Sequence, residues 1–138
     1  MARWVCPHCE REFGRARQAH VCVPGGTVDA TFAGKPAGQR AAYDVIVAHV
    51  ATLGPVHADA VGVGVFLKRG RTLAELRPKA RALSLSLILP RRVDDARVAR
   101  TIDLPGGRVV HFVKLRDAGD VDDRILDWVT EAYLAAGS

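Results

Sequence analysis

Every second residue from position 83 to position 89 is a leucine, and this alternation constrains the fold more than any other feature of the chain. Leu83, Leu85, Leu87 and Leu89 alternate with Ser84, Ser86 and Ile88. Because successive side chains of a β-strand point to opposite faces of a sheet, the four leucines share one face. The segment therefore predicts a strand with one buried face, whose other face is wet or covered by something smaller.

Further strands are predicted on both sides of this segment. Alternating valines indicate a strand over residues 56–68, and a turn at Gly70 leads into another over residues 72–77. Residues 101–104 and 108–115 flank a Pro-Gly-Gly turn, which is typical of a hairpin. Strands that are joined by short turns pair antiparallel. We therefore expect about five antiparallel strands.

Two segments carry apolar residues at helical spacing. The first helix is predicted over residues 39–53, and the second over residues 120–135 with Asp120 as its N-cap. Two helices that flank one sheet would most simply cover its leucine face. We therefore expect Trp128 and Val129 of the second helix to meet the leucines at 83, 85 and 87 in one core.

All three cysteines lie within the first 22 residues and form two close pairs with a histidine. Cys6 and Cys9 have the spacing of a zinc knuckle, and His20 and Cys22 follow with one residue between them. Structural Zn²⁺ takes four sulfur or nitrogen ligands, and an odd number of cysteines cannot all pair as disulfides within one chain. We therefore predict one structural Zn²⁺ held by Cys6, Cys9, His20 and Cys22.

Two alternatives to this ligand set remain open. In the first alternative, no metal is bound and the cysteines are free thiols of a frayed N-terminus, although chance rarely places three cysteines and a histidine in such pairs. Alternatively, His8 replaces His20 as the fourth ligand, although His8 stands inside the knuckle and would crowd both sulfur atoms.

These elements predict an α+β protein, a two-layer sandwich of a roughly five-stranded antiparallel sheet with an N-terminal and a C-terminal helix, preceded by a small zinc finger. Residues 1–24 would form the finger, residues 25–35 a linker and residues 36–138 the α+β domain. The 138 residues support one substantial core. Because the sequence shows neither a signal peptide nor the roughly 20 apolar residues that cross a bilayer, we expect a cytoplasmic protein without a membrane partner.

The formal net charge is +5, and one segment holds most of the basicity. Residues 68–100 contain ten basic and three acidic side chains, a net charge of +7. We expect the basic residues around its first two turns to bind a polyanion: Lys68, Arg69, Arg71, Arg77, Lys79 and Arg81. Together they would form one ridge of positive potential. The alternative is a solvated surface, because the excess of Arg over Lys is typical of a GC-rich genome.

The sequence assigns no catalytic residue. Ser84 and Ser86 lie in a regular strand, without the sharp elbow that exposes a serine nucleophile. His49 lies on the apolar side of a predicted helix and His111 within a predicted strand, so both are interpreted as satisfied, partly buried histidines. The pattern favours binding over catalysis.

The run Trp4-x-Cys-Pro-x-Cys-x-Arg-x-Phe13, followed by Gln18-x-His-x-Cys22, resembles the N-terminal finger of a bacterial family known as domain of unknown function 5655. Short segments at 53–54, 65–68, 77–79, 83–87 and 121–133 also resemble that family. The resemblance implies a small α+β domain, sometimes appended to nuclease-like proteins, with no established activity.

Two classes of function remain. The first is an accessory binding module that contacts the backbone of DNA or RNA, or another polyanion. Because the basic segment contains no Phe, Tyr or Trp, we expect contacts with phosphates rather than a platform for base stacking. The second is a module that binds another protein or a small ligand, with a purely structural zinc and no nucleic-acid role.

Metal analysis of the purified protein tests the zinc site. We expect one Zn²⁺ per chain and reduced occupancy in Cys9→Ser and His20→Ala, because a closed tetrahedral site needs all four ligands. Full occupancy in His20→Ala would remove His20 from the ligand set.

Overall fold

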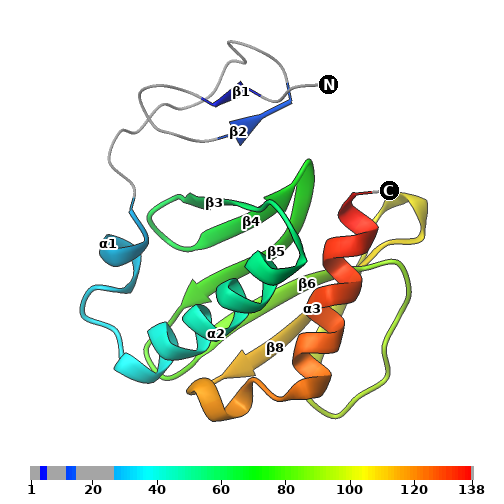
Figure 1. Ribbon diagram of the computed structural model, residues 1–138. Helices are drawn as coiled ribbons and strands as arrows, with labels where there is room; N and C mark the ends of the chain where they lie inside the picture. The colour runs from blue at the N-terminus through cyan, green and yellow to red at the C-terminus, as the bar shows by residue number, and fades with distance from the viewer. Residues whose placement is uncertain (1–3, 6–11, 15–26, 138) are drawn as a thin grey trace.

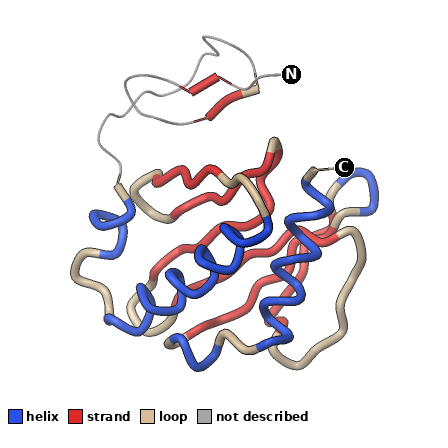
Figure 2. Tube along the Cα trace, in the orientation of Figure 1, coloured by secondary structure: helices blue, strands red, loops and turns tan. Residues whose placement is uncertain are grey.

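The computed structural model of the chain describes residues 4–5, 12–14 and 27–137. The predicted zinc ligands Cys6, Cys9, His20 and Cys22 lie outside the described residues. Within the described part, helices and one large antiparallel sheet make up an α+β fold, as predicted (Figures 1 and 2). The large sheet has six strands instead of the five expected.

The strand order in the sheet is β3-β4-β5-β6-β8-β7, and all neighbours are antiparallel. The strands are β3 (His57–Ala60), β4 (Val65–Arg69), β5 (Arg71–Pro78), β6 (Leu83–Leu89), β7 (Val98–Asp103) and β8 (Val109–Leu115). The leucine strand β6 lies inside the sheet, between β5 and β8. The predicted hairpin is confirmed as β7 and β8.

The additional strand comes from residues 56–68, which form two strands instead of one. A turn between β3 and β4 is closed by the Val61 N–H, which donates to the Gly64 carbonyl at 2.9 Å. Gly62 adopts a φ of 86°, a conformation that favours glycine because it has no Cβ. Valines alternate with glycines through this turn. The sequence therefore keeps the alternation typical of a strand at the point where the backbone reverses direction.

Three α-helices accompany the sheet: α1 (Val28–Phe32), α2 (Ala37–Leu53) and α3 (Asp123–Ala136). The two long helices, α2 and α3, lie over the same face of the sheet (Figure 1). The short helix α1 falls within the segment predicted as a linker, and its Phe32 is buried in the core. None of the helices in the described part combines the length and apolar character needed to span a membrane.

The N-cap of helix α3 is Asp122 instead of the predicted Asp120. The carboxylate of Asp122 accepts the Ile125 N–H at 3.0 Å. Asp120 instead ends the 3₁₀ turn η2 (Ala118–Asp120), where its carboxylate accepts the Arg116 N–H at 2.8 Å. Two aspartates lie close together here, and the turn before the helix decided which of them became the cap.

The core lies between the two long helices and the leucine face of β6. Leu83, Leu85 and Leu87 are fully buried and belong to one apolar cluster with Trp128 and Val129 of α3, as predicted. The opposite face of β6 carries Ser84, Ser86 and Ile88. We call this second face of the sheet the open face, because the two long helices do not cover it.

A two-stranded sheet of β1 (Trp4–Val5) and β2 (Glu12–Phe13) contacts the edge of the large sheet through Glu12. The Glu12 N–H lies 3.3 Å from both carboxylate oxygens of Asp59, and Lys68 Nζ donates to the Glu12 carbonyl at 3.3 Å. Asp59 in turn pairs with Lys68 Nζ at 2.6 Å and with His57 Nε2 at 2.5 Å. The Asp59–Lys68 pair therefore binds both backbone polar groups of Glu12.

Asp59 is only 2% exposed, so its charge depends on these partners. A buried carboxylate is tolerated when a cation and hydrogen-bond donors replace the water that it has lost. The Lys68 side chain is itself largely buried. Removing Asp59 would leave the Lys68 ammonium largely buried without a carboxylate partner.

Leu85→Ala tests the core. We expect a loss of about 2–5 kcal/mol in the free energy of unfolding, because the substitution leaves a cavity at a fully buried position. Leu134→Ala on α3 is the matched control, since Leu134 is 59% exposed and its truncation leaves no cavity. Equal losses in chemical denaturation of the two variants would contradict the assignment of Leu85 to the core.

Asp59→Ala tests the contact between Glu12 and the sheet. We expect about 3–5 kcal/mol of destabilisation, because Lys68 would remain buried without its carboxylate. The Glu12 amide would also exchange its hydrogen faster, because it loses its acceptor. Asp44→Ala is the control, since Asp44 forms an exposed pair with Arg40 that contributes about 0.3–0.5 kcal/mol. Unchanged exchange at Glu12 in Asp59→Ala would show that Asp59 does not hold β2.

Candidate anion-binding site

The six predicted polyanion-binding residues lie at two different ends of the sheet. Lys68, Arg69 and Arg71 surround the β4–β5 turn, whereas Arg77, Lys79 and Arg81 surround the β5–β6 turn. Consecutive turns of antiparallel strands alternate between the ends of a sheet, and the eight residues of β5 span about 25 Å. The structure therefore brings the last three together and does not join all six in one ridge.

Two of the three residues at the β4–β5 turn have partners within the protein. Lys68 is engaged by Asp59 and Glu12, as described above. The guanidinium of Arg69 lies 4.3 Å from the centre of the Tyr133 ring and donates to the Tyr133 carbonyl at 3.1 Å. A cation near the last carbonyls of a helix is favourable, so Arg69 completes the end of α3. Arg71 is exposed at the turn.

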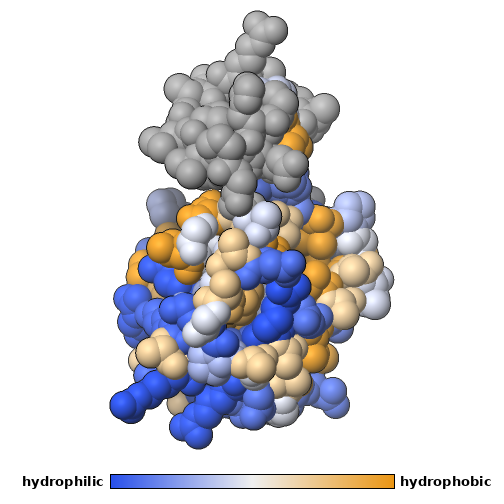
Figure 3. All heavy atoms as spheres, turned by 90° about the vertical axis from the view of Figure 1, so that its left-hand side faces the viewer, coloured by the Kyte–Doolittle hydropathy of each residue, from blue (hydrophilic) through white to orange (hydrophobic). Residues whose placement is uncertain are grey.

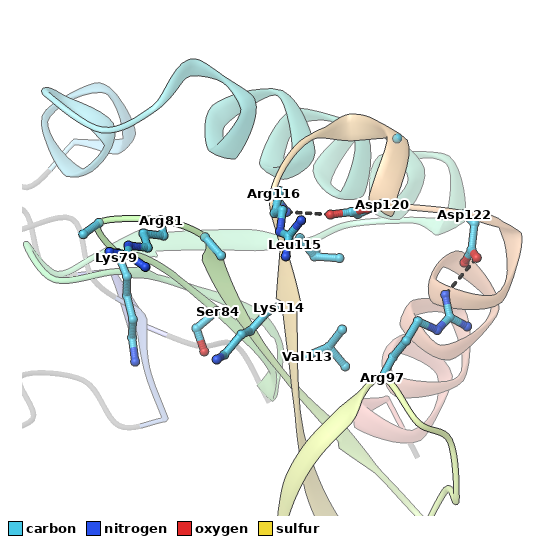
Figure 4. A pocket seen from close by; sticks show the side chains of 13 residues that line it. Lys79, Arg81, Ser84, Arg97, Val113, Lys114, Leu115, Arg116, Asp120 and Asp122 are labelled. Carbon is cyan, nitrogen blue, oxygen red and sulfur yellow. Dashed lines mark hydrogen bonds and ion pairs between the residues drawn. The ribbon is translucent and has the colours of Figure 1, made fainter.

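The residues at the β5–β6 turn border a hollow of about 790 Å³. The turn itself, the end of β8, the last two residues of η2 and the residue before β7 all contribute to its walls (Figure 4). The charged residues that line it are Lys79, Arg81, Arg97, Lys114, Arg116, Asp120 and Asp122. Figure 3 faces the end of the molecule where the β5–β6 turn lies, and hydrophilic residues cover much of that surface.

The β5–β6 turn is held in place by a buried glutamine of α2. The Gln39 side chain donates from Nε2 to the Lys79 carbonyl at 2.6 Å, and its Oε1 accepts the Lys79 N–H at 3.1 Å. Gln39 is fully buried, so both bonds are shielded from water. The opposite wall approaches closely at Gly38, where a Cβ would lie 2.5 Å from the Arg116 carbonyl oxygen. Both walls are therefore fixed by the first turn of the same helix.

Four cations around the hollow have no acidic partner in the described part of the chain. The side chains of Lys79, Arg81, Lys114 and Arg116 make no ion pair or hydrogen bond with any residue that the structure describes. Figure 4 shows Lys79 and Arg81 on the turn at one side of the hollow, with Lys114 and Arg116 on β8 and its C-terminal extension. Four uncompensated positive charges around one concave surface create a strongly positive local potential.

Among the described residues, the two aspartates of the wall, Asp120 and Asp122, form no ion pair with these four cations. Asp122 accepts the Ile125 N–H, which holds the pKa of its carboxyl below the ordinary value, and it also pairs with Arg97 at 2.8 Å. Asp95 also pairs with Arg97, and the Arg97 backbone N–H lowers the pKa of Asp95. Both carboxylates are therefore charged at neutral pH and compensate Arg97. Asp120 accepts the backbone N–H of Arg116.

A second hollow of about 330 Å³ continues from the first across the open face of the sheet. The two share Lys79, Ser84, Val113 and Lys114. The residues found only in the second are Glu75, Arg77, Ser86, Ala99, Arg100 and Phe112. One carboxylate also lines this hollow, that of Glu75, which pairs with Arg77 at 3.1 Å.

Lys114 and Arg116 were missed by the sequence reasoning, because both lie outside the basic segment 68–100. The pairing of β6 with β8 brings them to the larger hollow, because it places Lys114 directly opposite Ser84. The alternation of Val113, Lys114, Leu115 and Arg116 was the available signal, because it puts both cations on the polar face of the strand.

The histidines of the core have structural partners. His111 is 1% exposed, and its Nε2 accepts the Val93 N–H at 2.9 Å while Nδ1 lies 3.1 Å from the Val109 carbonyl oxygen. His49 Nε2 lies 2.7 Å from the Thr130 hydroxyl. Both agree with the interpretation of satisfied histidines. The described residues contain no group of three or more His, Cys, Asp or Glu side chains that could hold a metal ion.

Comparison with known proteins gives one match. The family model described as "Domain of unknown function (DUF5655)" matches residues 28–136, which run from α1 to the end of α3 and include both hollows. No curated protein and no solved structure matches the chain. Because the match covers most of the sequence, the chain belongs to the DUF5655 family.

Proposed function

We propose that this protein is an accessory binding module whose larger hollow binds phosphate groups of a nucleic-acid backbone. The observation that carries the proposal is a set of four cations around one concave surface, Lys79, Arg81, Lys114 and Arg116, which have no acidic partner among the residues that the structure describes. Like charges in close proximity repel one another, and a bound anion removes that repulsion. Arginine and lysine side chains are the groups that most often contact phosphate oxygens in such complexes.

The extent of the basic surface favours a chain of phosphates over a single anion. The two hollows are continuous, and Lys79 and Lys114 line both of them. Cations are therefore distributed along the surface rather than converging on one point. A nucleic-acid strand carries one phosphate charge per nucleotide, a repeated anion that matches such a distribution.

The proposal includes a structural Zn²⁺ held by Cys6, Cys9, His20 and Cys22. The pairing of Trp4 with Phe13 and of Val5 with Glu12 supports it, because the segment that connects these strands carries Cys6 and Cys9. A two-stranded hairpin alone is at best marginally stable in water. A metal bound to its connecting segment would supply the missing stability, as in other small metal-binding units.

Salt-dependent binding tests the phosphate site. We expect the logarithm of the affinity for DNA or RNA to fall linearly with the logarithm of the salt concentration, by about 0.9 per phosphate contacted on a duplex and about 0.7 on a single strand. In the double variant Arg81→Ala/Arg116→Ala, affinity should drop at least about tenfold. The reason is that each hydrogen bond to a charged group contributes about 1.5–3 kcal/mol, and 1.4 kcal/mol corresponds to tenfold.

The double variant Arg71→Ala/Arg108→Ala is the matched control. It removes the same two side-chain types and the same charge, but from the far end of the sheet, where both residues line a separate small recess. Affinity and salt slope should then stay close to those of the unmodified protein. Equal losses in the two double variants would show a non-specific effect of net charge. An absence of binding to either nucleic acid at low salt would leave a protein or small ligand as the partner.

A further inference from the structure

We infer that the nucleic acid is single-stranded and that the smaller hollow on the open face receives one of its bases. This inference rests on the proposed function, because it places a base beside the phosphates bound in the larger hollow. Three features of the smaller hollow carry it: a carboxylate among its cations, its planar side chains, and a serine hydroxyl that has no partner among the described residues.

The smaller hollow combines cations with a carboxylate. Glu75 lies on its wall, where the Glu75 carboxylate pairs with Arg77 at 3.1 Å. The cations Lys79, Arg100 and Lys114 also line it. A neutral group with both hydrogen-bond donors and acceptors can face both kinds of charge, and a nucleobase is the neutral part of a nucleotide that carries such groups.

The planar side chains, Arg100 of β7 and Phe112 of β8, lie opposite each other on two paired strands. Strand pairing sets Glu75, Ser86, Phe112 and Arg100 side by side across β5, β6, β8 and β7. The Arg100 guanidinium lies 3.9 Å from the centre of the Phe112 ring. Arg100 is exposed and makes no ion pair with the described residues. Aromatic rings and guanidinium planes are the surfaces on which unpaired bases stack.

From the sequence we expected contacts with phosphates and no platform for base stacking, and the position of Phe112 changes that expectation. The absence of aromatic residues from the basic segment argued against base stacking, but Phe112 lies on β8, outside that segment. The sheet brings it next to Ser86 of β6. The stacking surface therefore comes from the pairing of strands.

The unpaired hydroxyl belongs to Ser86, in the floor of the smaller hollow. Ser86 is 7% exposed, and its hydroxyl makes no hydrogen bond with the part of the chain that the structure describes. A buried polar group without a partner is unfavourable, so a ligand atom that bonds to it is stabilising. A hydroxyl both donates and accepts, which suits the mixed edges of a base.

A duplex cannot use this pair of hollows in the same way. Its bases are stacked and paired inside the helix, so one of them reaches a recess beside the phosphate site only after it is flipped out, at a cost of a few kcal/mol. Bases of a single strand are accessible without that cost. The geometry therefore favours single strands over duplexes of the same sequence.

Fluorescence anisotropy with the full-length protein tests the inference at one fixed salt concentration. The probes are a labelled 12-nucleotide single strand, the duplex of the same sequence, and a single strand with abasic residues throughout. We expect the natural single strand to bind more tightly than both others, because only it presents both a phosphate chain and accessible bases. Equal affinity for the natural and the abasic single strands would overturn the inference.

The double variant Arg100→Lys/Phe112→Leu removes both planar groups while it keeps the charge and an apolar side chain. Its affinity for the natural single strand should fall between about 5-fold and 100-fold, the range that stacking of one base contributes. Its affinity for the abasic strand should not change. The control Arg92→Lys/Phe66→Leu makes the same substitutions outside both hollows, and circular dichroism establishes that each variant is folded. An unchanged affinity of the first variant for the natural strand would refute base binding.

The two proposals fail in different ways. If only the base subsite is wrong, the natural and the abasic single strands bind equally, and all three probes lose affinity in Arg81→Ala/Arg116→Ala. If the phosphate site is also wrong, none of the probes binds at low salt.

Discussion

The alternation of side chains along β6 is the constraint on which the rest of the molecule depends. Leucines on one face are fully buried beneath the helices, whereas serines on the other face form part of the floor of the two hollows. A shift of one residue in the pairing of β6 would exchange these faces, because side chains alternate with a period of two. The same register therefore stabilises the core and exposes the polar floor of the candidate site.

The candidate site also depends on which cations remain unpaired. Arg97 is compensated by Asp95 and Asp122, and Lys68 by Asp59, so these basic residues serve the folded structure. Around the larger hollow, Lys79 and Lys114 keep their charges available. The distinction between stabilising and available cations arises from the positions of the carboxylates in space, which the net charge of a segment does not reveal.

Local patterns in the sequence predicted most elements of the fold. Periodicity identified β6, the two long helices and the β7–β8 hairpin, because each pattern is contained within neighbouring residues. The prediction was wrong at the β3–β4 turn, where valine and glycine continue to alternate while the backbone reverses at Gly62. It was also wrong at the start of α3, where bonding within a 3₁₀ turn selected Asp122 over Asp120 as the cap. Both errors lie at boundaries, where local competition decides the structure.

The sequence by itself determined the α+β fold class and the leucine face of the core, and it singled out Lys79 and Arg81, which line the larger hollow. Only the tertiary structure decided that Lys114 joins this cluster, that Arg69 instead stacks on Tyr133, and that Phe112 lies beside Ser86. The physical reason is that periodicity and turn chemistry act between near neighbours in the chain. The pairing of β6 with β8, in contrast, joins residues about thirty positions apart, and no local pattern specifies which charges and rings will face each other across it.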